Sequence, residues 1–244
     1  MKYLCGFKCF LNEAIIDWES QNIKDFYEET LNNIIANPRR NISFEDLVKI
    51  GESHEVEIVH YTQFYNDLPD DTYRKGAPPS FAPYFALVNE KNRKIRVVLN
   101  DSTQFINGMV LDEIYHMMKH ENVHLGQLAH SAPRKLGGMN VKDQGEYFSD
   151  KDELMAFSQS VSDKIMDRAP KDMATAIKYL KDVGLWNSIK GTVKDPKLIN
   201  RYKKYIYLYL EAEFKKRAEL TKKKKKMPKK KTKLKSDAKL QTIL

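Results

Sequence analysis

The sequence of 244 residues contains little cysteine and lacks any long apolar run. Cys5 and Cys9 are its only cysteines, too few for a disulfide framework or for a structural zinc site of four thiolates. No run of about 18 apolar residues occurs, so the sequence predicts no transmembrane helix. Lys8 interrupts the apolar patches at the start, which makes a poor secretory signal. We therefore expect a reduced, cytoplasmic protein that no signal peptide directs to secretion.

Glycine and proline are also scarce, with 10 and 9 residues, which excludes a collagen-like or low-complexity chain. Hydrophobic residues make up 41% of the sequence, enough for a folded core. The net charge of +9 is concentrated at one end: residues 215–244 contain 14 Lys and Arg against Glu219 and Asp237. We therefore predict a domain over residues 1–214 and a polycationic tail over residues 215–244, which is disordered past Leu220.

The tail has no aromatic residue between Lys222 and Lys239. Lysine binds phosphates as a point charge, so we expect this segment to attract nucleic acid, or an anionic membrane, without reading a sequence. The alternative is a solvated tail that only aids solubility.

Hydrophobic periodicity predicts helices and strands in separate parts of the domain. The fold class is therefore α+β, with a small antiparallel sheet packed beside several helices. The expected helices are 12–36, about 43–50, 108–129, 150–167, 171–183 and 197–219, and the expected strands are 55–60, 84–88 and 94–99.

Four of the six histidines lie between residues 116 and 130, where the sequence includes His120-Glu121-Asn122-Val123-His124. On a helix, His120 and His124 project from one face, so both imidazoles reach one metal ion. Zinc binds neutral imidazole, and a carboxylate between the two histidines can accept a proton from an attacking water. An apolar stripe places Glu121 on the packed side, where a carboxylate needs a partner. The motif predicts a Zn²⁺ site with Glu121 as general base; the alternative is a surface helix with scattered histidines.

Two residues are candidates for a third protein ligand. Glu153 lies near the start of the next predicted helix, on its packed side. The alternative role for Glu153 is a capping box with Asp150, which stabilises a helix end without chemistry. His130 follows His124 by six residues, but a helix that continues that far turns it about 120° away. We predict Glu153 as the ligand and keep His130 as the alternative.

An H-E-x-x-H at His120–His124 followed by Glu153 on the next helix resembles the gluzincin type of zincin metallopeptidase. The segments 120–127 and 153–157 are also similar to small zincin-like proteins encoded by bacteriophages. The resemblance implies a zincin-like fold, zinc bound by His120, His124 and Glu153, and Glu121 as general base and acid. It also implies an edge strand above the ion for an extended substrate, and 94–99 resembles that strand. Larger enzymes of this type support a histidine ligand with an acid, at the position taken here by Phe157.

The leading hypothesis is a zinc-dependent peptidase whose substrate is a protein or peptide held near nucleic acid by the tail. Its oxyanion stabiliser is expected among Tyr147, His116 and His130. The alternative is a nucleic-acid-associated structural or virion protein that uses a zincin scaffold without catalysis. A metal-dependent hydrolase of another bond is a third hypothesis. If a phage encodes the protein, its location is the host cytoplasm or the virion.

Overall fold

The computed structural model describes residues 20–67, 83–89, 92–130 and 144–226. Cys5, Cys9, the first part of the predicted helix 12–36 and the end of the lysine-rich tail lie outside these residues. The described elements, in chain order, are α2 Gln21–Ala36, β1 Asn41–Ser43, α3 Phe44–Ser53, β2 Val56–His60, α4 Tyr61–Asn66, β3 Tyr84–Asn89, β4 Lys94–Leu99, β5 Phe105–Asn107, α5 Gly108–His130, α6 Gln144–Ser149, α7 Lys151–Met166, α8 Met173–Tyr179, the 3₁₀ helix Leu180–Asp182, α9 Gly184–Thr192 and α10 Pro196–Lys226. The α+β class is confirmed.

Side-chain caps set the starts of several helices. The Ser43 hydroxyl accepts a hydrogen bond from the Asp46 N–H (3.1 Å) at the start of α3. The Asn107 side chain accepts one from the Val110 N–H (3.0 Å), so the chain passes directly from β5 into α5. The long helix that contains residues 120–124 therefore begins at the edge of the sheet region.

The main sheet has three strands in the order β2-β4-β3. Strands β3 and β4 form the expected antiparallel hairpin, whereas β2 runs parallel to β4. The prediction of an antiparallel sheet is therefore wrong for β2, since alternation in a sequence identifies a strand but not its direction. The expectation that Lys94–Leu99 is the edge strand is also wrong: β4 is central and β3 lies at the edge. The buried run Val97-Val98-Leu99 is typical of a strand covered on both faces.

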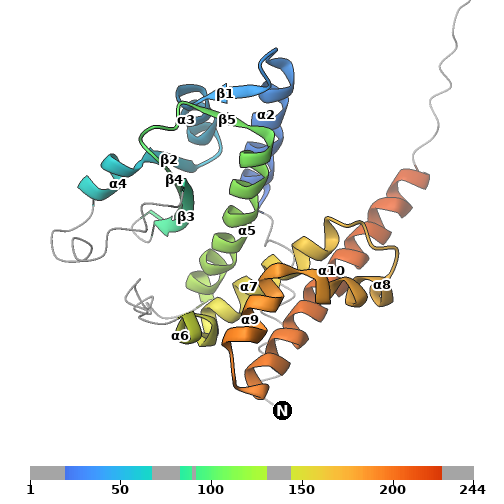
Figure 1. Ribbon diagram of the computed structural model, residues 1–244. Coiled ribbons are helices and arrows are strands. Elements are labelled where there is room, and N and C mark those ends of the chain that lie inside the picture. Colours follow the sequence, from blue (N-terminus) through green and yellow to red (C-terminus); the bar gives the residue numbers. More distant parts are fainter. Residues whose placement is uncertain (1–19, 68–82, 90–91, 131–143, 227–244) are drawn as a thin grey trace, which may run out of the picture.

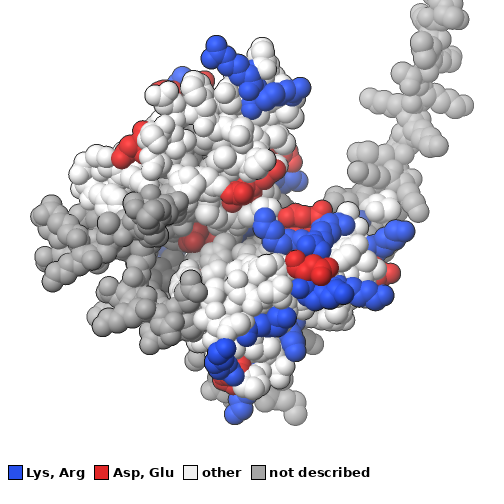
Figure 2. All heavy atoms as spheres, in the orientation of Figure 1, with Lys and Arg blue, Asp and Glu red and all other residues white. Residues whose placement is uncertain are grey.

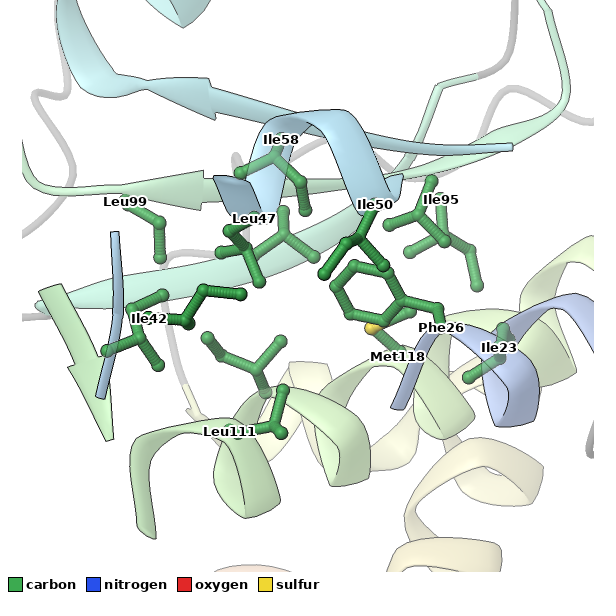
Figure 3. Close-up of a cluster of buried hydrophobic side chains, with 14 of the residues drawn as sticks. Ile23, Phe26, Ile42, Leu47, Ile50, Ile58, Ile95, Leu99, Leu111 and Met118 are labelled. Carbon is green, nitrogen blue, oxygen red and sulfur yellow. The ribbon is translucent and has the colours of Figure 1, made fainter. Parts of the chain in front are cut away.

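Two hydrophobic cores flank the long helix α5, which runs from the strands and N-terminal helices to the C-terminal helices (Figure 1). The first core joins α2, α3, the strands and the first half of α5, with Met118 of α5 beside Phe26 of α2 (Figure 3). The second core is formed by α6–α10 around Trp186 and Tyr202. A smaller cluster of Val123, Met155 and Ala156 lies between α5 and α7. The second half of α5 therefore lies where the two cores meet.

Three further predictions differ from the structure. No helix is predicted just before residue 150, but the short helix α6 lies there. The expected helix 171–183 is a short α8 followed by a 3₁₀ turn. Helix α9 was not expected, because Gly184 and Gly191 mask its apolar pattern. The sequence predicts disorder past Leu220, but α10 continues to Lys226. Lysine is a good helix former, so a helix already stabilised by packing extends into the lysine run.

Among the described helices, none combines the length and the hydropathy needed to cross a bilayer.

Gly51 permits the close packing of α3 on β2. A Cβ atom at this position would lie 2.6 Å from the Val56 carbonyl oxygen and 2.8 Å from Ile58 Cγ1. We predict that Gly51→Ala lowers the free energy of unfolding by about 1–3 kcal/mol, as overpacked cores do. Gly191→Ala in α9 is the control, because a Cβ there has no neighbour within 4 Å. Urea unfolding midpoints measure both; equal effects would contradict the close packing.

Candidate metal centre

Helices α5 and α7 bring together His120, His124 and Glu153. Among the described residues, these three form a group that can hold a metal ion, with their ligand atoms within 4.8 Å of one another. Glu153 Oε2 lies 3.4 Å from His120 Nε2 and 3.6 Å from His124 Nε2. The side chains are 12%, 7% and 19% exposed, so the group is largely shielded from solvent.

These distances fit a shared ion better than direct hydrogen bonds. A well-formed N–H···O bond spans about 2.7–3.2 Å, and Glu153 Oε2 is buried without one. Two ligands bound at about 2.0–2.1 Å to a tetrahedral zinc ion lie about 3.3 Å apart. The separations between Glu153 and the two histidines match that edge.

Hydrogen bonds on the far side of each ring determine which nitrogen faces the centre. The Ser160 hydroxyl donates to the Ala156 carbonyl (3.1 Å), so it accepts from His120 Nδ1–H at 3.1 Å. The Gln127 Oε1 atom, an acceptor only, lies 2.9 Å from His124 Nδ1. Both Nδ1 atoms therefore carry hydrogen, and in the neutral rings both Nε2 lone pairs face Glu153. Three electron-rich atoms converge, an arrangement that requires a cation or a proton between them.

Without a metal ion, a proton on His124 meets this requirement. Burial alone would lower the pKa of His124, but the Glu153 carboxylate and the charge of Glu121 raise this pKa to about 9. Burial alone would raise the pKa of Glu153, but the two histidines lower it to about 2. The metal-free protein therefore holds an ion pair at the centre.

Neither alternative for the third ligand is favoured by the described geometry. The Asp150 N–H donates to the Tyr147 carbonyl (3.2 Å), and the Glu153 carboxylate faces the histidines rather than the helix end. A capping box therefore does not account for Glu153. Helix α5 continues to His130, and six helical residues after His124 a side chain projects about 120° away. The His130 side chain itself lies outside the description.

Glu121 is partly buried beside the two histidines, as its position between them requires. Burial raises the pKa of Glu121, and the charge of Glu153 raises it further, whereas the histidines and a hydrogen bond from the Val88 N–H lower it. Val88 lies on the edge strand β3, so this carboxylate links α5 to the sheet edge. It is held next to the centre but is not a member of the metal-holding group.

The outer edge of β3 runs beside this carboxylate. Two backbone hydrogen bonds lie at the ends of the hairpin. The Asn100 N–H donates to the Pro83 carbonyl (3.0 Å), and the Arg93 N–H donates to the Asn89 carbonyl (2.8 Å). Alternate residues of an antiparallel strand face its partner, so the backbone groups of Tyr84, Ala86 and Val88 face away from β4. No other described strand pairs with this edge.

Of the three oxyanion candidates, the structure places Tyr147 at the centre. Its hydroxyl hydrogen-bonds to the Glu153 carboxylate, and burial, followed by the charges of Glu153 and Glu121, raises the pKa of Tyr147. The Tyr202 hydroxyl of α10 donates to the Phe148 carbonyl (2.7 Å), which anchors α6 and with it Tyr147. Tyr147 therefore stays protonated at neutral pH.

His116 is not part of the group. Its imidazole faces Asp163 (3.6 Å) and Asp167 (3.3 Å), and it lines a separate cavity of about 440 Å³. Burial lowers the pKa of His116, but the two carboxylates outweigh this and raise it.

The His120 ring is held by two side chains of α7. Phe157 packs edge-on against the His120 ring, at 4.8 Å between centroids, and Ser160 supplies the hydrogen bond. Sequence analysis missed Ser160 and Gln127. Gln127 follows His124 by three residues, a helical spacing that is a usable signal. Ser160 lies on another helix, and nothing in the sequence connects it to His120.

Comparison of the chain with protein-family models, curated proteins and solved structures finds no match.

Metal affinity should depend on pH through His124. The proton on His124 must leave before its nitrogen binds zinc, so the apparent zinc affinity should rise about tenfold per pH unit up to about pH 9 and then level off. Competition with a chromogenic chelator at fixed pH measures this. An affinity that does not change between pH 7 and pH 9 would contradict the protonated centre.

The stability of the metal-free protein should fall over the pH range in which the apparent zinc affinity rises. The contribution of His124 is complete below pH 6.5, its unfolded value, and is lost as the pH rises through about 9. The contribution of Glu153 is present above pH 4.5 and is lost as the pH falls through about 2. The stabilisation from this pair is therefore greatest between pH 4.5 and 6.5.

Ser160 should contribute to metal binding by fixing the His120 ring. We predict that Ser160→Ala lowers zinc affinity about 10- to 100-fold, the usual effect of removing such a partner. Ser158→Ala is the matched control, since Ser158 also donates to a carbonyl four residues earlier on α7. Equal zinc affinities in chelator competition would show that Ser160 does not hold the ring.

Proposed function

We propose that the protein is a zinc-dependent peptide hydrolase with a zincin-like arrangement of helices and sheet edge. The observation that carries this proposal is the convergence of two imidazole Nε2 atoms and a buried carboxylate oxygen, beside the separate carboxylate of Glu121. The H-E-x-x-H spacing explains how α5 supplies three of these four groups.

The ligand set favours zinc and an open coordination position. Two imidazoles and one carboxylate form a typical catalytic zinc set, whereas structural sites usually have four protein ligands. Among the described residues, only three potential ligands converge in the group. When bound, a zinc ion supplies a Lewis acid that polarises a carbonyl group and lowers the pKa of water.

Glu121 is the residue that moves protons. Its carboxylate accepts a proton from the attacking water and returns it to the leaving amine nitrogen. Burial raises the pKa of Glu121, which makes its carboxylate a stronger base than an exposed one. The Val88 N–H holds the carboxylate against the sheet edge, so its orientation does not depend on the substrate.

The edge of β3 favours an extended peptide as substrate. The outward-facing backbone groups of Tyr84 and Ala86 can pair with a peptide main chain, as in β-augmentation. Such pairing places a peptide carbonyl beside the centre without reading its side chains. The Tyr147 hydroxyl, protonated at neutral pH, donates to Glu153 in the metal-free protein; turned from this carboxylate, it is the donor for the developing oxyanion.

The test is Glu121→Gln in zinc-loaded protein, with Glu52→Gln on the exposed face of α3 as control. The variant should keep its zinc, measured by elemental analysis. It should lose peptide cleavage by about 10²–10⁴-fold, because only the base is removed. Mass spectrometry of a mixed peptide substrate detects cleavage. Zinc binding without cleavage by either protein would favour the non-catalytic scaffold, and absence of zinc binding would contradict the metal site.

A further inference from the structure

Exposed basic side chains line the outer surface of α9 and the first half of α10. Residues 184–210 contain six cations and one acidic residue, Asp195. Asp195 is engaged at the start of α10, where its Oδ1 accepts the Lys197 N–H (2.8 Å). We call the six exposed residues the basic ridge: Lys190, Lys194, Lys197, Arg201, Lys203 and Lys204.

The basic ridge lies away from the metal centre. Tyr202, Ile206 and Tyr209 form the buried face of α10, which packs against α7. At about 100° per residue, Lys197, Arg201 and Lys204 lie on the opposite side of the helix. A ligand on the ridge therefore leaves the space around Glu153 and the edge of β3 open.

The charge of the ridge contrasts with the rest of the molecule. The described residues between 20 and 130 include 8 basic and 13 acidic side chains. On the face drawn in Figure 2, Lys and Arg side chains gather over the C-terminal helices. Such a concentration of one sign on one surface attracts a polyanion and speeds its association.

The surroundings of the ridge distinguish between polyanions. An interfacial helix needs large apolar side chains to enter a membrane, and a stable protein interface needs an apolar core. Within residues 184–210 the structure records one exposed large hydrophobic side chain, Tyr207, which is too little for an inserted apolar face or an apolar interface core. Nucleic-acid backbones are bound mainly by charge, with no such requirement. We propose that the basic ridge is a binding surface for the phosphodiester backbone of nucleic acid.

Helix α10 extends this surface. Its 31 residues span about 46 Å, and its last turns enter the lysine run that begins at Lys222. Four of the six ridge residues, Lys197, Arg201, Lys203 and Lys204, therefore lie on the helix that continues into this run. Nucleic acid bound by the run can also contact the ridge. The proposal is independent of peptide hydrolysis, because no ridge residue contributes to the metal centre.

The test compares two triple variants of the full-length chain. Lys197→Ala/Arg201→Ala/Lys204→Ala removes three ridge charges. Lys24→Ala/Arg39→Ala/Lys49→Ala removes the same number of charges from α2, α3 and the turn between them. Fluorescence anisotropy with a short labelled DNA duplex measures affinity over a series of KCl concentrations. The ridge variant should bind about tenfold or more weakly, with a salt slope about 2–3 units shallower, whereas the control should match the wild type.

Three results would overturn the proposal. The first is no binding of the duplex by the wild type at low salt. The second is equal affinities and slopes for the ridge variant and the wild type, which would assign binding to the lysine run alone. The third is loss of binding to phosphatidylserine vesicles in the ridge variant with unchanged DNA binding. Thermal unfolding of both variants checks that they are folded.

Discussion

The contact between α5 and α7 is the constraint on which the candidate metal centre depends. Glu153, early in α7, meets the second half of α5, whereas Asp163, late in α7, binds Lys119 nearer the start of α5. The two helices are therefore antiparallel, and a slip of one turn would separate both pairs of charges. Asp163 and Lys119 are almost fully buried, so breaking their ion pair would leave uncompensated charges in the interior. These buried pairs specify the axial register that places Glu153 opposite the two histidines.

Helix α7 has small side chains toward both of its neighbouring helices. Ala156 packs beside Val123 of α5. Ser162 lies on the other side, where its hydroxyl contacts the Ile206 carbonyl of α10. The small Ala156 side chain lets α5 and α7 approach closely, which brings the Glu153 carboxylate within reach of the two histidines of α5. The same approach lets Ser160 reach His120, so ligand and supporting residue share one structural cause.

Sequence patterns predicted the parts of this arrangement that are local. The spacing of His120 and His124 is fixed by the helix that contains them, and the hairpin of β3 and β4 follows from alternating residues around a polar turn. The order of strands in a sheet is not a local property. β2 pairs directly with β4, although β3 lies between them in the sequence, so the sequence analysis assigned the sheet edge to the wrong strand. Ser160 was missed for the same reason. Glu153 was predicted from its place on the packed side of its own helix, and the structure brings it to His120 and His124.

The group of His120, His124 and Glu153 is electrostatically unfavourable when it holds neither a metal ion nor an added proton. Two Nε2 lone pairs and a carboxylate oxygen repel one another unless a positive charge lies between them. In the metal-free protein a proton on His124 supplies the positive charge, because the carboxylates of Glu153 and Glu121 raise the pKa of His124 to about 9. A divalent ion meets it with more charge and releases the ring to its neutral form. Glu121 lies outside this group and accepts a hydrogen bond from the Val88 N–H of the edge strand, so an ion held by the other three residues would leave this carboxylate without a metal bond.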